Sequence, residues 1–323
     1  ISDNRKEWLH ASMGIMAIGA ADVPRGCDAT AKEIVYILSF AECRTAVLEN
    51  AAQVRKILDN RQSLPLLSAV IAFEDPGEAQ TAELKAAGIE AYGYADIIGL
   101  GKKYRSAKPG AVEAELEKGV SDDLATLIFT SGTTGEPKGV MLTHGNFLSQ
   151  LDELPARIML QPGDRALCVL PVWHSFERLC EYVILISASA IVYSKPVGSV
   201  LLADLAAMNP HLMPSVPRIW ESVYDGIYRS MRKTGGVTWA LFNFFVNAAI
   251  LESRLERNVT GLRPLFRHGE RAFLAAVSFV PFLLLWPIKA LGGAIVFRKI
   301  RAKLGSSFRC GVSGGGALPP NID

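Results

Sequence analysis

A run of eleven residues from Thr130 to Val140 is the part of the chain best suited to chemistry. It follows a short apolar stretch, Asp123 to Phe129, which predicts a strand entering a loop. Glycines let a backbone take positive φ and bring its N–H groups close to a ligand, and successive N–H groups form a concave nest for anions. Hydroxyl groups and a lysine add donors and positive charge. The run therefore predicts a phosphate-binding loop made by Thr130, Ser131, Gly132, Thr133, Thr134, Gly135 and Lys138.

Two other interpretations compete with this one. Clusters of small polar residues also form ordinary flexible surface turns. A P-loop NTPase would need a glycine directly before the lysine, but Pro137 stands there and Gly139 follows Lys138. This spacing disfavours an ordinary P-loop NTPase.

The complete run, T-S-G-T-T-G-x-P-K-G-V, resembles the phosphate-binding loop of the AMP-forming acyl-activating (adenylate-forming) superfamily. Acyl-CoA synthetases, acyl-ACP synthetases, luciferases and the adenylation domains of peptide synthetases belong to it. The resemblance implies that Lys138 holds the pyrophosphate end of ATP. Near the start of the chain, Asn4 to Trp8 and Gly19 to Pro24 also resemble the superfamily. Val23 to Gly26, together with Asp28, is closest to its long-chain and acyl-ACP types.

A histidine stands just beyond another predicted strand, the apolar run from Arg165 to Leu170. Open α/β sheets bind ligands outside the carboxyl ends of their strands, although a histidine here also suits the start of a helix. The pattern Pro171-x-x-His174-x-x-Glu177 resembles the second core motif of the superfamily. The resemblance implies that His174 lies beside the bound carboxylate and shapes the acyl site. Glu177 is expected on the same helix face, orienting its neighbours.

Two later segments resemble parts of an acyl site. Trp220 shares an apolar stripe with Tyr224 and Ile227, which is typical of a core helix, but V-P-x-x-W also resembles the gate segment of fatty acyl-CoA synthetases. Both interpretations of Trp220, core residue and acyl gate, stay open. Glycines after a strand allow a flat ring or a chain to approach the backbone. By resemblance, the loop that borders adenine and the acyl chain is made by Gly314, Gly315, Gly316 and Ala317.

Strands and helices alternate along the first part of the chain. A capping box is predicted at Asn4 and Glu7, and buried strands at Thr45–Leu48 and residues 66–73. The alternation predicts βαβ units and an α/β fold. The resemblance implies the large N-terminal domain of the adenylate-forming fold over residues 1–323, with stacked, mainly parallel sheets and flanking helices. The domain is expected to be truncated at both ends, with the C-terminal domain outside the chain.

Composition excludes some classes of function. The 34 basic and 32 acidic residues leave a net charge of +2, so no nucleic-acid partner is expected. The five cysteines lack close pairing or ligand spacing and are expected to be reduced core residues, without a metal site or disulfide framework.

Residues 232–304 form a basic and apolar insert, which is expected to be helical. Ala272 to Ile288 is a run of seventeen residues without a charge. As a helix it would span about 26 Å, short of the roughly 30 Å hydrocarbon core of a membrane. Pro281 and Pro287 are expected to break it further, so spanning is not expected unless the run from Ala290 to Phe297 extends the helix. Burial in a soluble hairpin stays open, but the flanking arginines and lysines favour docking on an anionic membrane surface.

The resemblance implies a ligase that activates a long-chain fatty acid with ATP, through an acyl-adenylate, and passes the acyl group to a thiol of CoA or acyl carrier protein. Mg²⁺ is expected with the nucleotide. The Y-G-x-T-E motif, ribose-binding aspartate and catalytic lysine of the superfamily lie outside this chain, which is therefore expected to be inactive by itself. The alternative is a non-catalytic nucleotide- or lipid-binding membrane module derived from the fold. The expected location is the cytoplasm, with peripheral attachment to a membrane left open.

Overall fold

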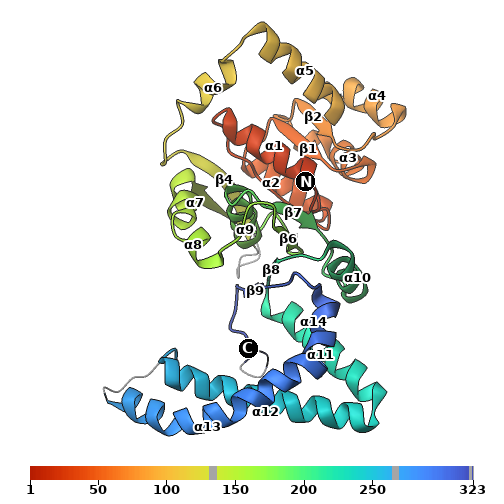
Figure 1. Cartoon of the computed structure of the whole chain (residues 1–323). Helices are drawn as coiled ribbons and strands as arrows, with labels where there is room; N and C mark the ends of the chain where they lie inside the picture. Colours follow the sequence, from red (N-terminus) through yellow and green to blue (C-terminus); the bar gives the residue numbers. More distant parts are fainter. Residues whose placement is uncertain (131–136, 264–268, 320–321, 323) are drawn as a thin grey trace. The chain divides into compact units, whose positions relative to one another are not determined.

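A computed structural model describes residues 1–130, 137–263, 269–319 and 322 of the chain (Figure 1). These residues divide into two units. Unit 1 comprises residues 1–164 and 168–193, and unit 2 comprises residues 165–167 and 194–323.

Unit 1 alternates helices with short strands. In chain order its elements are α1 (Lys6–Ala17), α2 (Ala31–Phe40), β1 (Thr45–Leu48), α3 (Ala51–Leu58), η1 (Arg61–Ser63), β2 (Ala69–Ala72), α4 (Glu78–Ala86), β3 (Glu90–Gly93), α5 (Tyr94–Ala107), α6 (Ala111–Leu116), β4 (Leu124–Thr130), β5 (Lys138–Thr143), α7 (His144–Leu151), α8 (Leu154–Ile158), α9 (Ser175–Ile186) and β7 (Ala190–Tyr193).

Unit 2 combines a small sheet with long helices. Its elements are β6 (Arg165–Cys168, of which the first three residues belong to this unit), α10 (Gly198–Met208), β8 (Leu212–Ser215), α11 (Pro217–Thr234), α12 (Gly236–Thr260), α13 (Glu270–Gly292), the π-helical stretch η2 (Gly293–Phe297), α14 (Arg298–Leu304) and β9 (Cys310–Ser313). The sheet is parallel, because β8 pairs with both β6 and β9 in that sense.

The first sheet of unit 1 confirms the predicted α/β class. Its strands β1, β2 and β3 are parallel, and the helices α3 and α4 connect them, as parallel pairing requires. Strands and helices share one apolar core, in which Leu48 and Val70 of the sheet are buried with Val54, Ile57 and Leu84 of the helices. β1 has its predicted bounds.

The second predicted strand is shorter than expected. β2 begins at Ala69 rather than at residue 66, because the N–H of Leu67 donates to the carbonyl of Leu64 in a turn (3.2 Å). Leu67 is nevertheless only 1% exposed. The apolar run therefore forms a strand over only part of its length, and Leu66 at its start is 50% exposed.

β4 and β5 depart from the mainly parallel arrangement, because they form an antiparallel hairpin. Thr130 at the end of β4 pairs with Lys138 at the start of β5. The connection between them is shorter than the roughly twelve residues that a parallel crossover needs. Because the predicted phosphate loop is so short, the two strands that it connects must be antiparallel.

A buried ion pair joins three elements of unit 1. The guanidinium of Arg178, on α9, is completely buried and donates to both carboxylate oxygens of Asp22 at 2.8 and 2.9 Å. It also donates to the hydroxyl oxygens of Ser12 on α1, Thr126 on β4 and Tyr182 on α9, at 2.6 to 2.9 Å. These acceptors compensate for the loss of water around the charge, so the pair fastens α1, β4 and α9 together.

Changing Arg178 to Met should strongly destabilise the protein, because it leaves the Asp22 carboxylate buried without its cation. Removing one partner of a buried pair costs about 3 to 5 kcal/mol. Denaturant unfolding followed by circular dichroism measures the change, and a second change, Asp22→Asn, should recover part of it.

The matched control is Arg55→Gln, which breaks an exposed pair with Glu83 on neighbouring helices. Exposed pairs contribute about 1 kcal/mol or less. If Arg178→Met costs no more than Arg55→Gln, the buried pair does not hold the fold together.

One prediction for the apolar insert is wrong, and the structure excludes one alternative that was left open. The helix α13 runs through both Pro281 and Pro287 and continues through η2, so that Glu270–Phe297 is one helical segment of 28 residues. Proline already has a helical φ, and packing of α13 along α12 compensates for the hydrogen bonds that it cannot make. The segment is also not a buried hairpin, because only 6% of its most apolar window is buried. By length and composition alone, it is the one helix in the described residues that could cross a membrane.

Candidate active site

The two ends of the predicted phosphate loop lie opposite each other at the end of the β4–β5 hairpin. Thr130 and Lys138 are cross-strand partners, and the side chains of both are exposed. The loop residues Ser131, Gly132, Thr133, Thr134 and Gly135 lie outside the described residues. The arrangement leaves the ammonium group of Lys138 accessible at the base of the loop, where an anion held by the loop could reach it.

Helix α2 supports the base of this hairpin. The hydroxyl of Tyr36 donates to the carbonyl of Pro137 (3.3 Å), and Phe129 meets the rings of Tyr36 and Phe40 edge to face. Gly139 packs tightly beside Lys138: a Cβ there would lie 3.1 Å from the side chain of Leu127, which would have to shift by a few tenths of an ångström. Close packing on the strands thus positions the lysine.

His174 is the N-cap residue of α9, beyond the end of β6, as predicted from its motif. Its side chain is exposed and makes no capping hydrogen bond. Partial burial and the nearby Arg25 guanidinium lower the pKa of His174, with Asp28 opposing them. The imidazole is therefore neutral at pH 7 and offers one donor and one acceptor nitrogen. Arg25 and Asp28 come from the segment that resembled long-chain synthetases.

The loop that leads to His174 is held by a residue whose role we mispredicted. The predicted capping box at Asn4 does not form, because α1 begins at Lys6 without a side-chain cap. The Asn4 amide instead donates to the carbonyl of Leu170 (2.6 Å) and accepts from the N–H of Val172 (3.1 Å). A short polar residue near a helix start suits a local cap equally well, so the sequence could not reveal this distant partner.

A glycine allows the same loop to pack. A Cβ on Gly26 would lie 2.3 Å from the ring of Trp173, the residue before His174. Sequence reasoning did not single out this pair, although Gly26 belongs to the V-P-R-G segment. Gly26 and Asn4 together fix the approach to the candidate carboxylate site.

Glu177 does not share the environment of His174, although the helical spacing predicted one face for both. Glu177 is fully buried, next to Glu181 one turn further along α9. The Sγ of Cys168 and one carboxylate oxygen from each glutamate lie within 4.8 Å of one another. None of the four carboxylate oxygens has a hydrogen-bond partner of good geometry among the described residues.

Burial makes these two acids weak. It raises the pKa of Glu177 to about 8, helped by the neighbouring Glu181, and raises the pKa of Glu181 to about 7. Burial also raises the pKa of Cys168 well above that of a free thiol. The group therefore carries protons near neutral pH, and two like charges are avoided inside the core.

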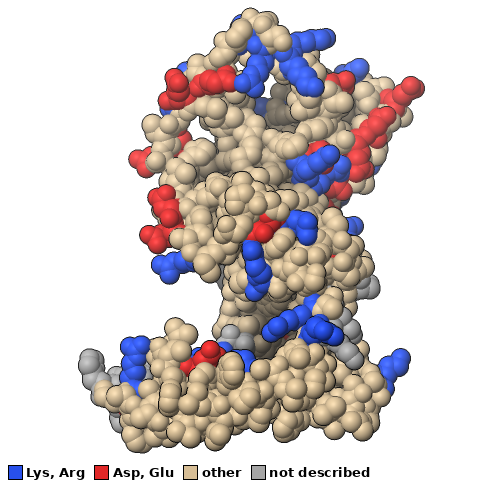
Figure 2. All heavy atoms as spheres, in the orientation of Figure 1, with Lys and Arg blue, Asp and Glu red and all other residues tan. Residues whose placement is uncertain are grey.

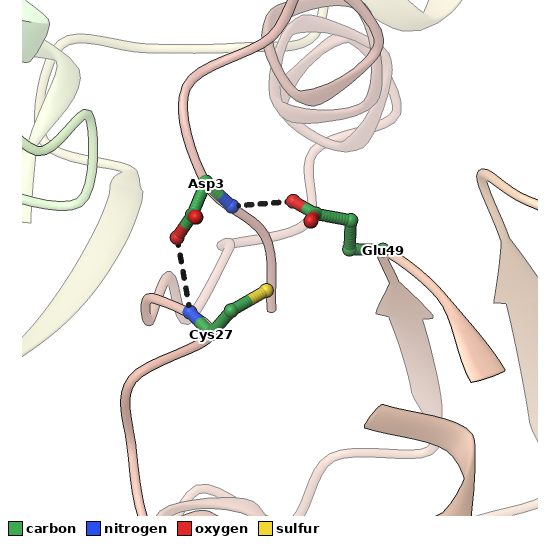
Figure 3. Close-up of side chains that lie close together, drawn as sticks. All are labelled: Asp3, Cys27 and Glu49. Atoms are coloured by element: carbon green, nitrogen blue, oxygen red, sulfur yellow. Dashed lines mark hydrogen bonds between the residues drawn. The ribbon is translucent and has the colours of Figure 1, made fainter. Parts of the chain in front are cut away.

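A second group of potential ligands has a different character. Figure 3 shows the three residues, Asp3, Cys27 and Glu49. The carboxylates of Asp3 and Glu49 already accept hydrogen bonds. Glu49 accepts from the N–H of Asp3 (2.7 Å) and from Ser2 Oγ (2.9 Å), and Asp3 accepts from the N–H of Cys27 (3.4 Å). Burial and the two carboxylates raise the pKa of Cys27 to about 12. The group fastens the start of the chain to the end of β1 and does not resemble a metal site.

Trp220 lies on α11 in unit 2 and is half-buried. Its ring covers Gly311 of β9 so closely that a Cβ there would lie 2.4 Å from it, and Phe308 lies beside it with ring centroids 6.4 Å apart. The indole Nε1 is buried without a hydrogen-bond partner among the described residues. The predicted glycine loop follows β9: Gly314 donates to the carbonyl of Ser215 (3.0 Å), and Gly315 has φ of +76°. The roles of Trp220 and of Gly314 to Ala317 stay predictions.

The family model of AMP-binding enzymes matches residues 1–323. The chain belongs to the AMP-binding enzyme family.

Named relatives of this AMP-binding chain are long-chain fatty acid ligases. All of the chain aligns at 31% identity with 45% of a chloroplastic long-chain-fatty-acid–[acyl-carrier-protein] ligase of Arabidopsis thaliana. At 28% identity, 98% of the chain aligns with 47% of a long-chain-fatty-acid–CoA ligase of Mycobacterium tuberculosis. The chain thus spans a little less than half the length of these relatives.

Solved structures support the fold of this AMP-binding chain. An anthranilate CoA ligase in complex with anthranoyl-AMP matches with a TM-score of 0.53 and 19% identity, over 69% of this chain and 40% of the other. A red-emitting luciferase of Phrixothrix hirtus matches with a TM-score of 0.51 and 15% identity, over 68% of this chain and 40% of the other. The predicted adenylate-forming fold is confirmed.

The buried acids predict how the stability of this AMP-binding chain depends on pH. Their folded pKa values lie above the ordinary 4.5, so the folded state binds protons more tightly than the unfolded state. This contribution to stability is complete below about pH 4.5 and is lost as pH rises through 7 to 8. Glu181→Gln keeps the side chain neutral. We expect its free energy of unfolding to exceed that of the wild type above about pH 8, by up to about 3 kcal/mol, and to match it near pH 4.

Urea unfolding at both pH values measures the difference, with Glu117→Gln, at an exposed position, as the control. A Glu181→Gln protein that is less stable than the wild type above pH 8 would show that this carboxylate is ionised and held by a cation, contrary to the inference.

Proposed function

We propose that the full-length protein containing this chain activates a long-chain fatty acid with ATP and passes the acyl group from the adenylate to a thiol of CoA or acyl carrier protein. The observation that carries the proposal is the alignment of the whole chain with a long-chain-fatty-acid–[acyl-carrier-protein] ligase at 31% identity. The complete T-S-G-T-T-G-x-P-K-G-V run supports it, since its lysine stands at the base of a hairpin loop. The choice between the two thiols is left to experiment.

The residues of this chain suit the charge changes of the first step. Adenylation builds negative charge on the α-phosphate and on the departing pyrophosphate, and fixed donors lower its barrier. Lys138, on the first position of β5, would hold the pyrophosphate end. His174, neutral and exposed at the start of α9, would line the carboxylate, whereas Glu177 stays uncharged in the core beside Glu181.

The described residues do not supply a magnesium site at the phosphate loop. Neither of the two groups of acidic and thiol side chains that lie close enough together to hold a metal ion includes a residue of the β4–β5 hairpin. Magnesium therefore enters the proposal only as the companion of ATP. In unit 2, we assign Trp220 to the acyl gate and Gly314 to Ala317 to the border of adenine and the acyl chain, on the strength of the motifs.

Changing Lys138 to Ala should lower the adenylation rate of the full-length protein. Losing one charge-assisted contact of about 1.5 to 3 kcal/mol corresponds to roughly a 10- to 150-fold loss of rate. Pyrophosphate exchange that depends on fatty acid measures it. An exposed lysine on another element, Lys102→Ala, serves as the control. If pyrophosphate exchange is unchanged in the Lys138→Ala protein, Lys138 does not hold the pyrophosphate end of ATP.

We also propose that the insert docks on a membrane surface. The outer side of α13 exposes Phe273, Val280, Leu284 and Trp286, each at least 60% accessible. Arg271 precedes this apolar surface and Arg298 and Arg301 follow it, all exposed. Figure 2 shows a largely uncharged surface over α12 and α13, with basic side chains at its margins. Anionic lipid headgroups suit such margins, and acyl chains suit the apolar surface.

Changing Val280, Leu284 and Trp286 together to Ser should remove binding to vesicles that contain anionic lipid, because the buried apolar area is lost. Co-sedimentation measures binding, and circular dichroism checks the fold.

A protein with three equally exposed apolar residues of unit 1 changed to Ser, at Ile18, Leu116 and Val120, is the matched control and should still bind. If the α13 variant binds as well as this control, the docking proposal fails.

A further inference from the structure

A groove of about 380 Å³ lies within the helical part of unit 2. Tyr224 and Tyr228 of α11 form one wall, and Phe297 and Ile300 of η2 and α14 contribute to another. One face of α12 runs along the groove from Phe242 to Arg257. All these elements belong to the same unit, so the groove is a feature of that unit alone.

The α12 face of the groove changes from apolar to basic along its length. Its first part presents Phe242, Val246, Ala249 and Ile250, and its last part presents Ser253, Arg254 and Arg257. Arg257 lies fifteen positions after Phe242 on the helix, which corresponds to a length of about 22 Å. The groove thus has the polarity of an amphiphile with one anionic end and one long apolar chain.

The groove can accept an anion at its basic end. Arg254 is exposed and forms no ion pair with any acidic residue that the structure describes. The acids nearest to it along α12, Glu252 and Glu256, are engaged instead by Lys289 of α13. An unpaired guanidinium beside an apolar wall favours a carboxylate, which accepts two parallel hydrogen bonds.

The aromatic wall is ordered. The rings of Tyr224 and Tyr228 lie against each other with centroids 4.3 Å apart and planes tilted by 30°, and Tyr228 meets Phe242 edge to face at 5.0 Å. Burial, together with the neighbouring Tyr224 hydroxyl, raises the pKa of Tyr228 to about 12, so its hydroxyl stays neutral. The wall therefore adds no negative charge that would repel an anionic ligand.

We propose that this groove binds one long-chain carboxylate, with its chain against Phe242, Val246 and Ala249 and its head at Arg254. The inference rests on the proposed function, because it gives the fatty acid a second binding place, on the insert and separate from the nucleotide. A single groove suits the single chain of a free fatty acid better than the two chains of a phospholipid. Binding here would concentrate the substrate on the protein before activation.

The test measures binding of hexadecanoate to this chain without nucleotide, by equilibrium dialysis. Arg254→Gln should weaken binding roughly 10- to 150-fold, the range for a lost charge-assisted contact. Binding of hexadecanol, which lacks the charge, should be weaker than that of hexadecanoate and should not change with Arg254→Gln. The control is Arg229→Gln, at an exposed arginine of α11 that does not line the groove.

A second variant tests the chain end of the groove without changing any charge. Ala249→Trp should fill the apolar part and abolish binding, whereas Asn247→Trp adds the same ring at an exposed position of α12 and should leave binding intact. Thermal unfolding checks that both proteins fold. If Ala249→Trp destabilises the protein, Val246→Ser takes its place, with a smaller expected loss.

Three outcomes would overturn the inference. Equal binding by the Arg254→Gln and wild-type proteins would remove the head site, and equal binding by the Ala249→Trp and Asn247→Trp proteins would remove the chain site. If the protein with three serines on α13 lost hexadecanoate binding while the Ala249→Trp protein kept it, the fatty acid would be bound on α13 instead. Because the assay contains no ATP, failure of adenylation would leave these results unchanged and would count against the proposed function alone.

Discussion

The buried ion pair between Arg178 and Asp22 is the constraint on which the candidate site of unit 1 depends. A completely buried guanidinium is tolerated only where acceptors surround it, and here they come from α1, β4 and α9. The backbone of Asp22 also bonds to β4, through the N–H of Leu127 and the carbonyl of Ala125. Because β4 ends at Thr130 and α9 begins directly after His174, one charge pair restrains both predicted ends of the site.

The helix α9 can lie in the core because its arginine is paired with a carboxylate and its glutamates are protonated. Arg178 keeps its charge and is paired, with the rings of Trp8 and Phe147 within 5.6 Å of its guanidinium. Glu177 and Glu181, on a neighbouring face, keep their protons. A helix with two acidic residues and one arginine can therefore be buried with a single charge pair, although its stability then falls with rising pH.

The long helices of the insert in unit 2 have faces with different roles. Along one face of α12, Glu252 and Glu256 pair with Lys289 and fasten α13. Along another, the apolar and basic residues from Phe242 to Arg257 line a groove. The outer side of α13 is left without a protein partner in the described residues, which explains why so apolar a segment is so exposed. A bound fatty acid and a membrane surface would suit these two faces separately.

The sequence by itself determined the features that arise from local spacing. The phosphate-loop motif, the strand at Thr45–Leu48 and the position of His174 after a strand depend on residues a few positions apart. The structure has the strand and His174 where they were predicted. The family was predictable for the same reason, because its motifs are short and contiguous.

Only the tertiary structure decided which distant groups meet. Asn4 looked like a cap but holds the loop before His174, and nothing in the sequence paired Arg178 with Asp22. Glu177 was expected beside His174, yet its pKa and burial depend on α9 facing Cys168. Proline breaks isolated helices, but packing against α12 carried α13 through two of them. Hydropathy measures how apolar a segment is, whereas its exposure depends on which neighbours the fold supplies.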